Sequence, residues 1–401
     1  MRSSRQGIAL ILVLWVLAAL IVLALGLGVT VRSEVQISRN YADLIRCRWA
    51  ARAGINSAIG EIERLAKQPS VYLGELGRTL SSDELGIDLG GASFEVAIED
   101  EAGKVNINAA PASVLEALFG DREIADCIRD WRDKDDIPRS LGAETKYYSR
   151  LRTPYLAKNA PFDTVGELSL VKGITSEILS GPADAGERSL NTFITVYSYS
   201  KNVAADGKKR IDIRTASKEQ LKAELGDVLT DQDIEAIIKW RDGNAAAPAE
   251  PPEGERPSSG REEKLRSAGE IAAVPGLSRE KARLIYDRIT ASDAKVQPGR
   301  ININTAPAEA LAAVPGLDSR LAEEIVTYRE ANGPFEDVGQ LLEVSDLNAD
   351  AFAKAADLLT VRSGVFKIVS TGRLAGQQSS GVITCVVDAT DGKAKIRYWQ
   401  E

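Results

Sequence analysis

The sequence predicts an α+β protein, in which a long N-terminal helix and an antiparallel sheet carry a large inserted helical domain. Three observations support this fold class: an uncharged N-terminal stretch, strand-like segments near both ends of the chain, and helix-like segments that repeat between them. At 401 residues the chain is long enough to form more than one compact unit.

The composition excludes several kinds of chemistry. Histidine is absent, which removes Ser–His and Cys–His dyads and nearly all catalytic zinc sites. The cysteines Cys47, Cys127 and Cys385 form no C-x-x-C pair, so we expect buried apolar side chains. Without a nucleophile–base pair or a phosphate-binding glycine loop, we predict that the protein is not an enzyme. The net charge of −8 argues against a chain built mainly to bind nucleic acid.

The N-terminal segment at 8–31 has the length of a transmembrane helix. It carries no charge, and at about 1.5 Å per residue it spans a bilayer. It is too long for the apolar part of a removable signal peptide, and no small-x-small cleavage site follows it. Arg2 and Arg5 place the N-terminus in the cytoplasm and the remaining mass across the membrane. An ordinary single-pass anchor is an alternative at this point.

The helical pattern continues beyond the apolar segment, through residues 32–68, because no proline occurs before Pro69. Apolar residues recur there near helical spacing, which predicts a helix packed along one side of a domain. The residues expected on that packed face are Val35, Ile45, Trp49, Ile55, Ile59 and Ile62.

Strand signals stand on both sides of the central region. Phe94, Val96 and Ile98 alternate with smaller or charged residues, and three strand-like runs with turns at Gly376 and Gly392 close the chain. We therefore expect one antiparallel sheet built from 69–104 and 362–401, with the helical region inserted between its strands.

The inserted region contains an internal repeat. Similar segments start at Val105, Ile211 and Ile301, and each precedes a helix-like pattern that ends in W-R, W-R or Y-R. A third element follows as P-F-D-T-V-G-E-L at Pro161, L-R-S-A-G-E-I at Leu265 and P-F-E-D-V-G-Q-L at Pro334. These patterns predict helical modules at 105–200, 201–242 and 264–361, with a proline-rich linker at 243–263.

The third module resembles a helix-hairpin-helix unit, a fold that usually grips the nucleic-acid backbone. Such a grip needs glycine-turn amides and basic side chains close to phosphate. Residues 300–361 hold four basic side chains and eleven acidic ones, so phosphate would be repelled. We predict that the fold is kept without nucleic-acid binding.

One loop holds candidate metal ligands. Asp133, Asp135 and Asp136 precede a proline, and Glu144 follows closely. Oxygen ligands in a loop suit Ca²⁺ rather than zinc, although the spacing of an EF-hand is absent. A solvated acidic loop without a metal is the alternative interpretation.

The N-terminus resembles that of type IV pilin-like proteins, because R-Q-G followed by I-A-L-I-L-V-L-W-V-L is similar to a prepilin leader, residues 1–7, cut between Gly7 and Ile8. Such proteins normally carry Glu at the fifth mature position, where this chain has Leu12. That departure is typical of the K-type minor pseudopilins of type II secretion, the GspK family. Further matching segments are E-D-E-A-G-K-V-N-I-N-A at Glu99, W-R-D-K-D-D-I-P-R at Trp131, G-A-E-T-K-Y-Y at Gly142, Y-L-A-K-N-A-P-F-D-T-V-G-E-L at Tyr155 and R-Y-W ending at Trp399.

The resemblance implies a pilin-like helix and sheet with an inserted helical domain that binds calcium, anchored in the inner membrane with its head in the periplasm. It implies a place at the tip of the secretion pseudopilus, initiating or capping its assembly for protein export. The implied partners are the I- and J-type minor pseudopilins and the prepilin peptidase, with no nucleic acid. The copy around Ile211 looks like an extra module. The alternative is a membrane-anchored helix-hairpin-helix receptor for DNA uptake.

The leader junction gives the first testable prediction. Prepilin peptidase should cut between Gly7 and Ile8. A bulky residue in place of Gly7 should block the cut, because only a small residue lets the extended leader reach the active site. The mass of the mature N-terminal peptide from membranes measures this. Intact Met1 peptides in cells that contain the peptidase would contradict the pilin-like assignment.

Overall fold

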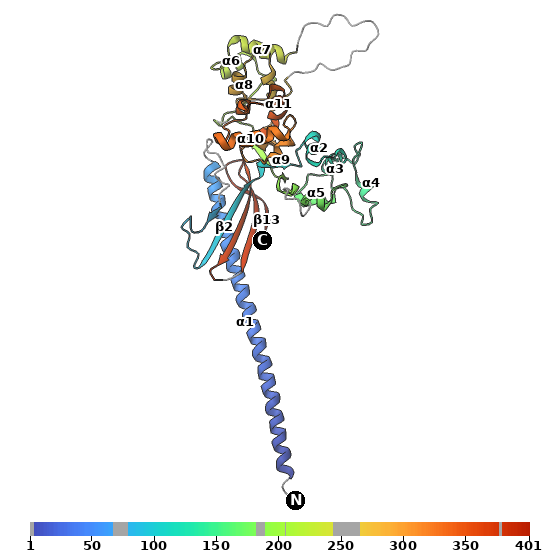
Figure 1. Cartoon of the computed structure of the whole chain (residues 1–401), viewed down its shortest axis with the longest axis vertical. Helices are drawn as coiled ribbons and strands as arrows, with labels where there is room; N and C mark the ends of the chain where they lie inside the picture. Colours follow the sequence, from blue (N-terminus) through green and yellow to red (C-terminus); the bar gives the residue numbers. More distant parts are fainter. Residues whose placement is uncertain (1–3, 67–78, 182–188, 205, 244–264, 377–378) are drawn as a thin grey trace.

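The computed structural model describes residues 4–66, 79–181, 189–204, 206–243, 265–376 and 379–401. Figure 1 shows a long helix that carries a sheet along its C-terminal half, with the helical modules gathered beyond the sheet. The predicted α+β fold is therefore confirmed. Residues 1–3 of the leader, the first part of the 69–104 segment and nearly all of the 243–263 linker lie outside the described residues.

A single helix, α1 (Ser4–Ala66), joins the apolar segment to the head, as the sequence predicts. From Ile11 to Ala42 it is exposed on all sides, and from Cys47 onward one face is buried against the sheet. Its apolar half is the one candidate membrane span among the described residues. One continuous rod thus connects the anchor directly to the folded head.

The sheet unites segments from both sides of the insertion. Its strands are β1 (Leu80–Ser81), β2 (Ala92–Asp100), β11 (Val365–Leu374), β12 (Ser380–Asp388) and β13 (Lys395–Gln400). They follow the order β1-β2-β11-β12-β13, and all neighbours are antiparallel. In the central pair Ile98 lies opposite Ile368, so the strand before the insertion pairs with the first strand after it.

Three glycines let α1 lie unusually close to this sheet. A Cβ atom on Gly54 would lie 2.3 Å from Ser370 Oγ, and one on Gly372 would lie 2.0 Å from the carbonyl oxygen of Cys47. On β12, a Cβ atom on Gly381 would lie 2.8 Å from the amide nitrogen of Arg48. Real Cβ atoms do not approach other atoms so closely, so the contact depends on residues without side chains. Among the buried side chains of this contact are Ala51, Ile55, Ala58, Ile62, Phe94, Val96, Ile368 and Ile383.

The packed face of α1 differs from the one expected from sequence. Ile55 and Ile62 are buried, but the exposed fraction is 44% for Val35 and 64% for Trp49. Trp49 lies two residues from both Cys47 and Ala51, and two residues turn a helix by about 200°. The small side chains of Cys47 and Ala51 face the sheet, so Trp49 faces away from it. The predicted placement of Val35 and Trp49 was therefore wrong.

The three cysteines are buried, as predicted, and the structure shows them as free thiols.

Each repeat is closed as a module by a short parallel pair of strands, one at its start and one at its end. The pairs are β3 (Val105–Asn106) with β4 (Ile194–Thr195), β6 (Ile211–Asp212) with β7 (Ile289–Thr290), and β9 (Ile301–Asn302) with β10 (Leu359–Thr360).

The helices of the modules are short. The first module holds α2 (Ala112–Phe119), α3 (Arg122–Arg132), α4 (Thr145–Tyr148), η3 (Val165–Leu170), α5 (Ser176–Ser180) and η4 (Leu190–Thr192). The second holds α6 (Lys218–Leu225), α7 (Asp231–Arg241), η5 (Ala268–Ala273) and α8 (Arg279–Tyr286). The third holds α9 (Ala308–Ala312), α10 (Ser319–Asn332), η6 (Val338–Glu343), α11 (Ala349–Ala355) and η7 (Ala356–Leu358). Outside the modules, η2 (Glu101–Gly103) follows β2, and β5 (Tyr199–Lys201) pairs with β8 (Val296–Pro298).

The second module is larger than predicted. Because Ile211 pairs with Ile289, residues 265–290 belong to this module, and the predicted boundary at 264 falls inside it. The second and third modules also pack together, with α8 against η6 and α11 against η5. Proline-rich sequence therefore interrupts a module here instead of separating two.

One arginine in each module explains the repeated W-R and Y-R endings. Arg132 donates hydrogen bonds to the carbonyl oxygens of Ile107 and Ala110. Arg241 binds the carbonyls of Ile213 and Ala216, and Arg329 those of Ile303 and Ala306. In every module the guanidinium thus ties the end of the second helix to the turn after the first strand.

One carboxylate connects the sheet to the third module. Asp100, the last residue of β2, accepts hydrogen bonds from the side chains of Ser363, Thr305 and Asn302 and from the amide of Ala102. Burial raises the pKa of this carboxyl above its usual value, although the four donors oppose the shift. The inserted domain is therefore attached to the sheet at a defined point.

The glycine contact predicts opposite effects for two substitutions in α1. Gly54→Ala should lower the free energy of unfolding by about 1–3 kcal/mol, because the methyl group overpacks the helix–sheet contact. Gly60→Ala, in the same helix with no atom within 4 Å of the added Cβ, should raise it by up to about 1 kcal/mol. Chemical denaturation of the detergent-solubilised chain measures both. Equal effects would contradict the close contact.

Candidate metal centre

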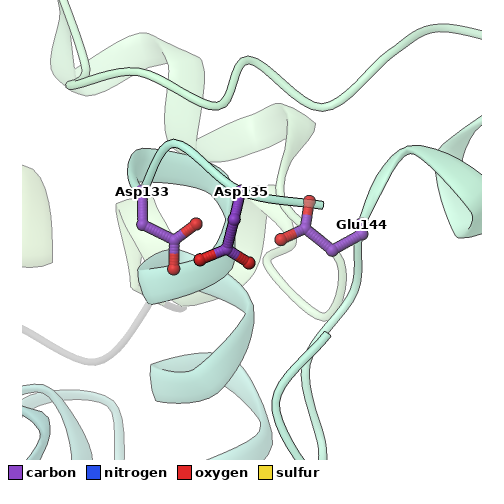
Figure 2. A group of neighbouring side chains, drawn as sticks. All are labelled: Asp133, Asp135 and Glu144. Carbon is purple, nitrogen blue, oxygen red and sulfur yellow. The ribbon is translucent and has the colours of Figure 1, made fainter. Parts of the chain in front are cut away.

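Three carboxylates converge in the first module, just beyond the end of α3. One oxygen atom from each of Asp133, Asp135 and Glu144 lies within 4.8 Å of the others. Figure 2 shows the three side chains turned toward one another from two segments of the loop. Asp133 is the C-terminal cap of α3, and Glu144 precedes α4.

Local hydrogen bonds shape this loop. The carboxylate of Asp135 accepts a hydrogen bond from the amide of Ile137 at 2.9 Å, which turns the chain. Arg139 bridges the carboxylates of Asp130 and Asp133, and Asp130 is fully buried. A Cβ atom on Gly142 would lie 1.8 Å from Asp130 Oδ2, so only glycine lets the loop pass at this distance.

The trio contains buried oxygens that lack hydrogen-bond donors. Glu144 is 2% exposed and neither of its carboxylate oxygens has a partner, and Oδ1 of Asp133 also has none. Burial, followed by repulsion from the surrounding aspartates, raises the pKa of Glu144 to about 7. Buried carboxylates without partners are costly, and a cation would satisfy them.

Asn159 contacts the backbone of one member of the trio. Asn159 donates a hydrogen bond of 2.7 Å to the carbonyl oxygen of Asp135, and its own side-chain oxygen is buried without a partner. Its backbone has φ of 47°, an uncommon conformation for a residue other than glycine. Sequence reasoning missed Asn159, because it lies in a separate loop and only the fold brings it to Asp135.

These residues suit a hard cation. Calcium takes six to eight oxygen ligands, and carboxylates with an amide oxygen are typical members of such a set. Asp133, Asp135 and Glu144 would hold the ion, Asn159 stands beside them, and any remaining positions would be filled by backbone oxygens or water.

The other predicted site residues lie elsewhere. Asp136 is exposed and accepts a hydrogen bond from the amide of Thr145, so it is not one of the converging trio. Leu12 is 61% exposed on the apolar half of α1. Gly7 and Ile8 lie within the α1 backbone, where side chains are outside the described part of the structure.

Comparison with known families finds two matches. Residues 103–181, which include the carboxylate trio, match the family model for type II secretion system (T2SS) protein K. Residues 296–360, the third module, match the helix-hairpin-helix motif, which confirms the fold predicted for this module.

Curated relatives agree with the first match. The type II secretion system protein K of Pectobacterium carotovorum is 26% identical over 228 residues, which cover 48% of this chain and 68% of the relative. Protein K of Pseudomonas aeruginosa is 31% identical over 198 residues, covering 43% of this chain and 59% of the relative. The transcriptional accessory protein Tex of Neisseria gonorrhoeae is 41% identical over 64 residues, which are 16% of this chain and 8% of Tex.

A solved structure aligns with nearly the whole chain. A chain in the crystal structure of the GspK-GspI-GspJ complex from enterotoxigenic Escherichia coli aligns with a TM-score of 0.49 at 14% identity, covering 92% of this chain and 98% of that one.

The chain thus has a long apolar helix packed on an antiparallel sheet, with modules inserted between the strands, as the resemblance implied. The family-model match and the curated relatives confirm the resemblance to type II secretion system protein K. These relatives are named as components of a secretion system, in keeping with the prediction that the chain is not an enzyme.

Calcium binding gives a prediction for the carboxylate trio. Calcium at about 100 times its dissociation constant should stabilise the folded chain by about 2.7 kcal/mol. Glu144→Gln should abolish most of this gain, because the buried carboxylate no longer supplies charge to the ion. Asp136→Asn is the matched control and should keep it. Thermal unfolding with calcium and with chelator measures the difference, and an undiminished gain in Glu144→Gln would contradict the assigned ligand set.

Proposed function

We propose that this protein is a minor pseudopilin at the tip of the type II secretion pseudopilus, where it initiates or caps assembly for protein export across the outer membrane. The observation that carries the proposal is the single helix α1, which joins an apolar segment with Leu12 to a head of three modules. The anchor would lie in the inner membrane with its N-terminus cytoplasmic and its head periplasmic, and prepilin peptidase would remove the leader at the cytoplasmic face.

Leu12 supports placement at the tip. In similar proteins a Glu at this position is thought to neutralise the new N-terminal amine of a neighbouring subunit, and a carboxylate in lipid is costly without that partner. A subunit with Leu12 cannot offer the contact. If each arriving subunit makes this contact to the subunit ahead of it, the subunit that lacks it comes first.

The shape of the head supports the same placement. The modules lie beyond the sheet, at the end of the molecule opposite the membrane segment, and the first module extends to one side (Figure 1). Modules in this position would obstruct subunits stacked above them in a filament. At the tip nothing stands above them.

The partners follow from the resemblance. The helix from Ile8 to about Leu65 would bundle with the helices of the I- and J-type minor pseudopilins; the similar solved structure is titled as a complex of GspK with GspI and GspJ. Calcium would hold the loop of Asp133 and Glu144 in place within the first module, in a structural role.

DNA uptake is a second candidate, favoured by the helix-hairpin-helix match. Three of the four basic side chains between 300 and 361 already have partners within the protein. Arg320 pairs with Glu324 and Asp346, Lys354 pairs with Asp350, and Arg329 binds carbonyl oxygens. The hairpin turn packs against α11, since a Cβ atom on Gly316 would lie 2.6 Å from the carbonyl oxygen of Ala351.

Duplex DNA binding separates the two candidates. The detergent-solubilised full chain should bind duplex DNA no more tightly than the non-specific range of about 10⁻⁴ M at ~150 mM salt, because acidic side chains repel phosphate. Fluorescence anisotropy over a range of salt concentrations measures this. Micromolar binding with a steep salt dependence would favour the DNA receptor.

The tip assignment gives a prediction for Leu12. Gold label on the head of the wild-type chain should appear at one end of each pseudopilus in electron micrographs. Leu12→Glu restores the carboxylate that other pseudopilins carry but leaves the obstructing modules in place, so fewer pseudopili should begin with this chain and the fraction labelled at one end should fall. Label found repeatedly along wild-type shafts would reject the assignment.

A further inference from the structure

The apolar residues of α1 that fail to pack on the sheet form a stripe of their own. We define the outer stripe as Val31, Val35, Ala42, Ile45 and Trp49, which follow one another at intervals of three, four or seven residues and so share one helix face. Val31, Val35, Ala42 and Trp49 are exposed and Ile45 is partly exposed. This face points away from the sheet, and four of its five side chains are exposed in the described structure.

Arginines follow one flank of the outer stripe. Arg32, Arg39 and Arg46 are spaced by seven residues, so they lie in a row with about 10.5 Å between neighbours. Arg46 is 3.9 Å from Asp43, and no ion pair is found for Arg32 or Arg39 within the described residues. At the upper end Arg52 lies over the rings of Trp49 and Trp399, which joins the stripe to the last strand of the sheet.

We propose that the outer stripe is the docking face for one helix of a different membrane-anchored subunit, which carries carboxylates at seven-residue intervals opposite the three arginines. The inference rests on the proposed function and names the chemistry of the partner that this function requires. Apolar residues at such intervals with charges along the flank are the pattern of helices that pack side by side.

Continuity with the membrane segment favours a helix over other occupants. The stripe begins where the uncharged segment ends, so a helix beside α1 in the bilayer would leave the membrane beside the stripe. Lipid headgroups beside Arg32 cannot attract the whole row. Arg46 lies about 21 Å further along the helix, and salt screens attraction between charges beyond a Debye length of about 8–10 Å.

A second copy of this chain fits poorly. Its helix would bring the same row of arginines, and the stretch from Arg32 to Arg52 holds five arginines but only two acids, Glu34 and Asp43. Like charges in facing positions destabilise such a pair. The partner helix must therefore be acidic where this one is basic.

Photo-crosslinking in membranes of cells with the whole secretion apparatus tests the proposal. A photo-reactive side chain at Ala42 of the full-length chain should crosslink to one membrane subunit. The same side chain at Asn40, exposed on the opposite face, is the control and should give little product. Arg39→Glu with Arg46→Glu should lower the Ala42 product by about tenfold. Lysines in place of the partner's acids should restore it, whereas Arg122→Glu on the first module should have no effect.

Several results would overturn the proposal: equal products from Asn40 and Ala42, products with lipid or a second copy alone, or no response to charge reversal. A third photo-reactive position, Leu20 in the apolar segment, distinguishes failure of the outer-stripe proposal from failure of the proposed function. If Leu20 crosslinks to other pseudopilins while Ala42 is silent, the stripe is wrong and the function stands. If neither crosslinks, both are wrong.

Discussion

The close contact between α1 and the sheet is the constraint on which the rest of the molecule depends. Gly54, Gly372 and Gly381 remove side chains where the helix crosses β11 and β12. That contact fixes which face of α1 packs on the head, and it leaves the opposite face exposed. The same helix continues without a break into the apolar segment, so the head and that segment are joined by one element.

The inserted modules repeat a small set of polar contacts. Each begins and ends in a parallel strand pair, and each uses one arginine to bind two carbonyl oxygens of its first turn. In the first and third modules, Asn108 and Asn304 also exchange paired hydrogen bonds with the backbone of Phe162 and Phe335. The second module has Arg214 at this position, paired with Asp212. It keeps the parallel strand pair and the arginine contact without this link.

The sequence predicted those features that depend on local periodicity. The long helix, the strands on both sides of the insertion and the repeats all leave signals in hydrophobic spacing. The packed face of α1 could not be assigned in this way, because the sheet selects small residues such as Ala51 and Gly54, and the large apolar residue Trp49 stays outside. Asn159 and the limits of the second module were missed for a related reason. Both depend on contacts between segments that are distant in sequence, such as Ile211 with Ile289.

The central claim is that a single copy of this chain stands at the end of each pseudopilus. The most direct test is the ratio of this chain to the major pseudopilin in purified filaments that have been sorted by length, determined by quantitative mass spectrometry. One copy at the tip predicts a ratio that falls in inverse proportion to filament length. A ratio that stays constant as filaments lengthen would show that the chain is distributed along the shaft, and would contradict the account.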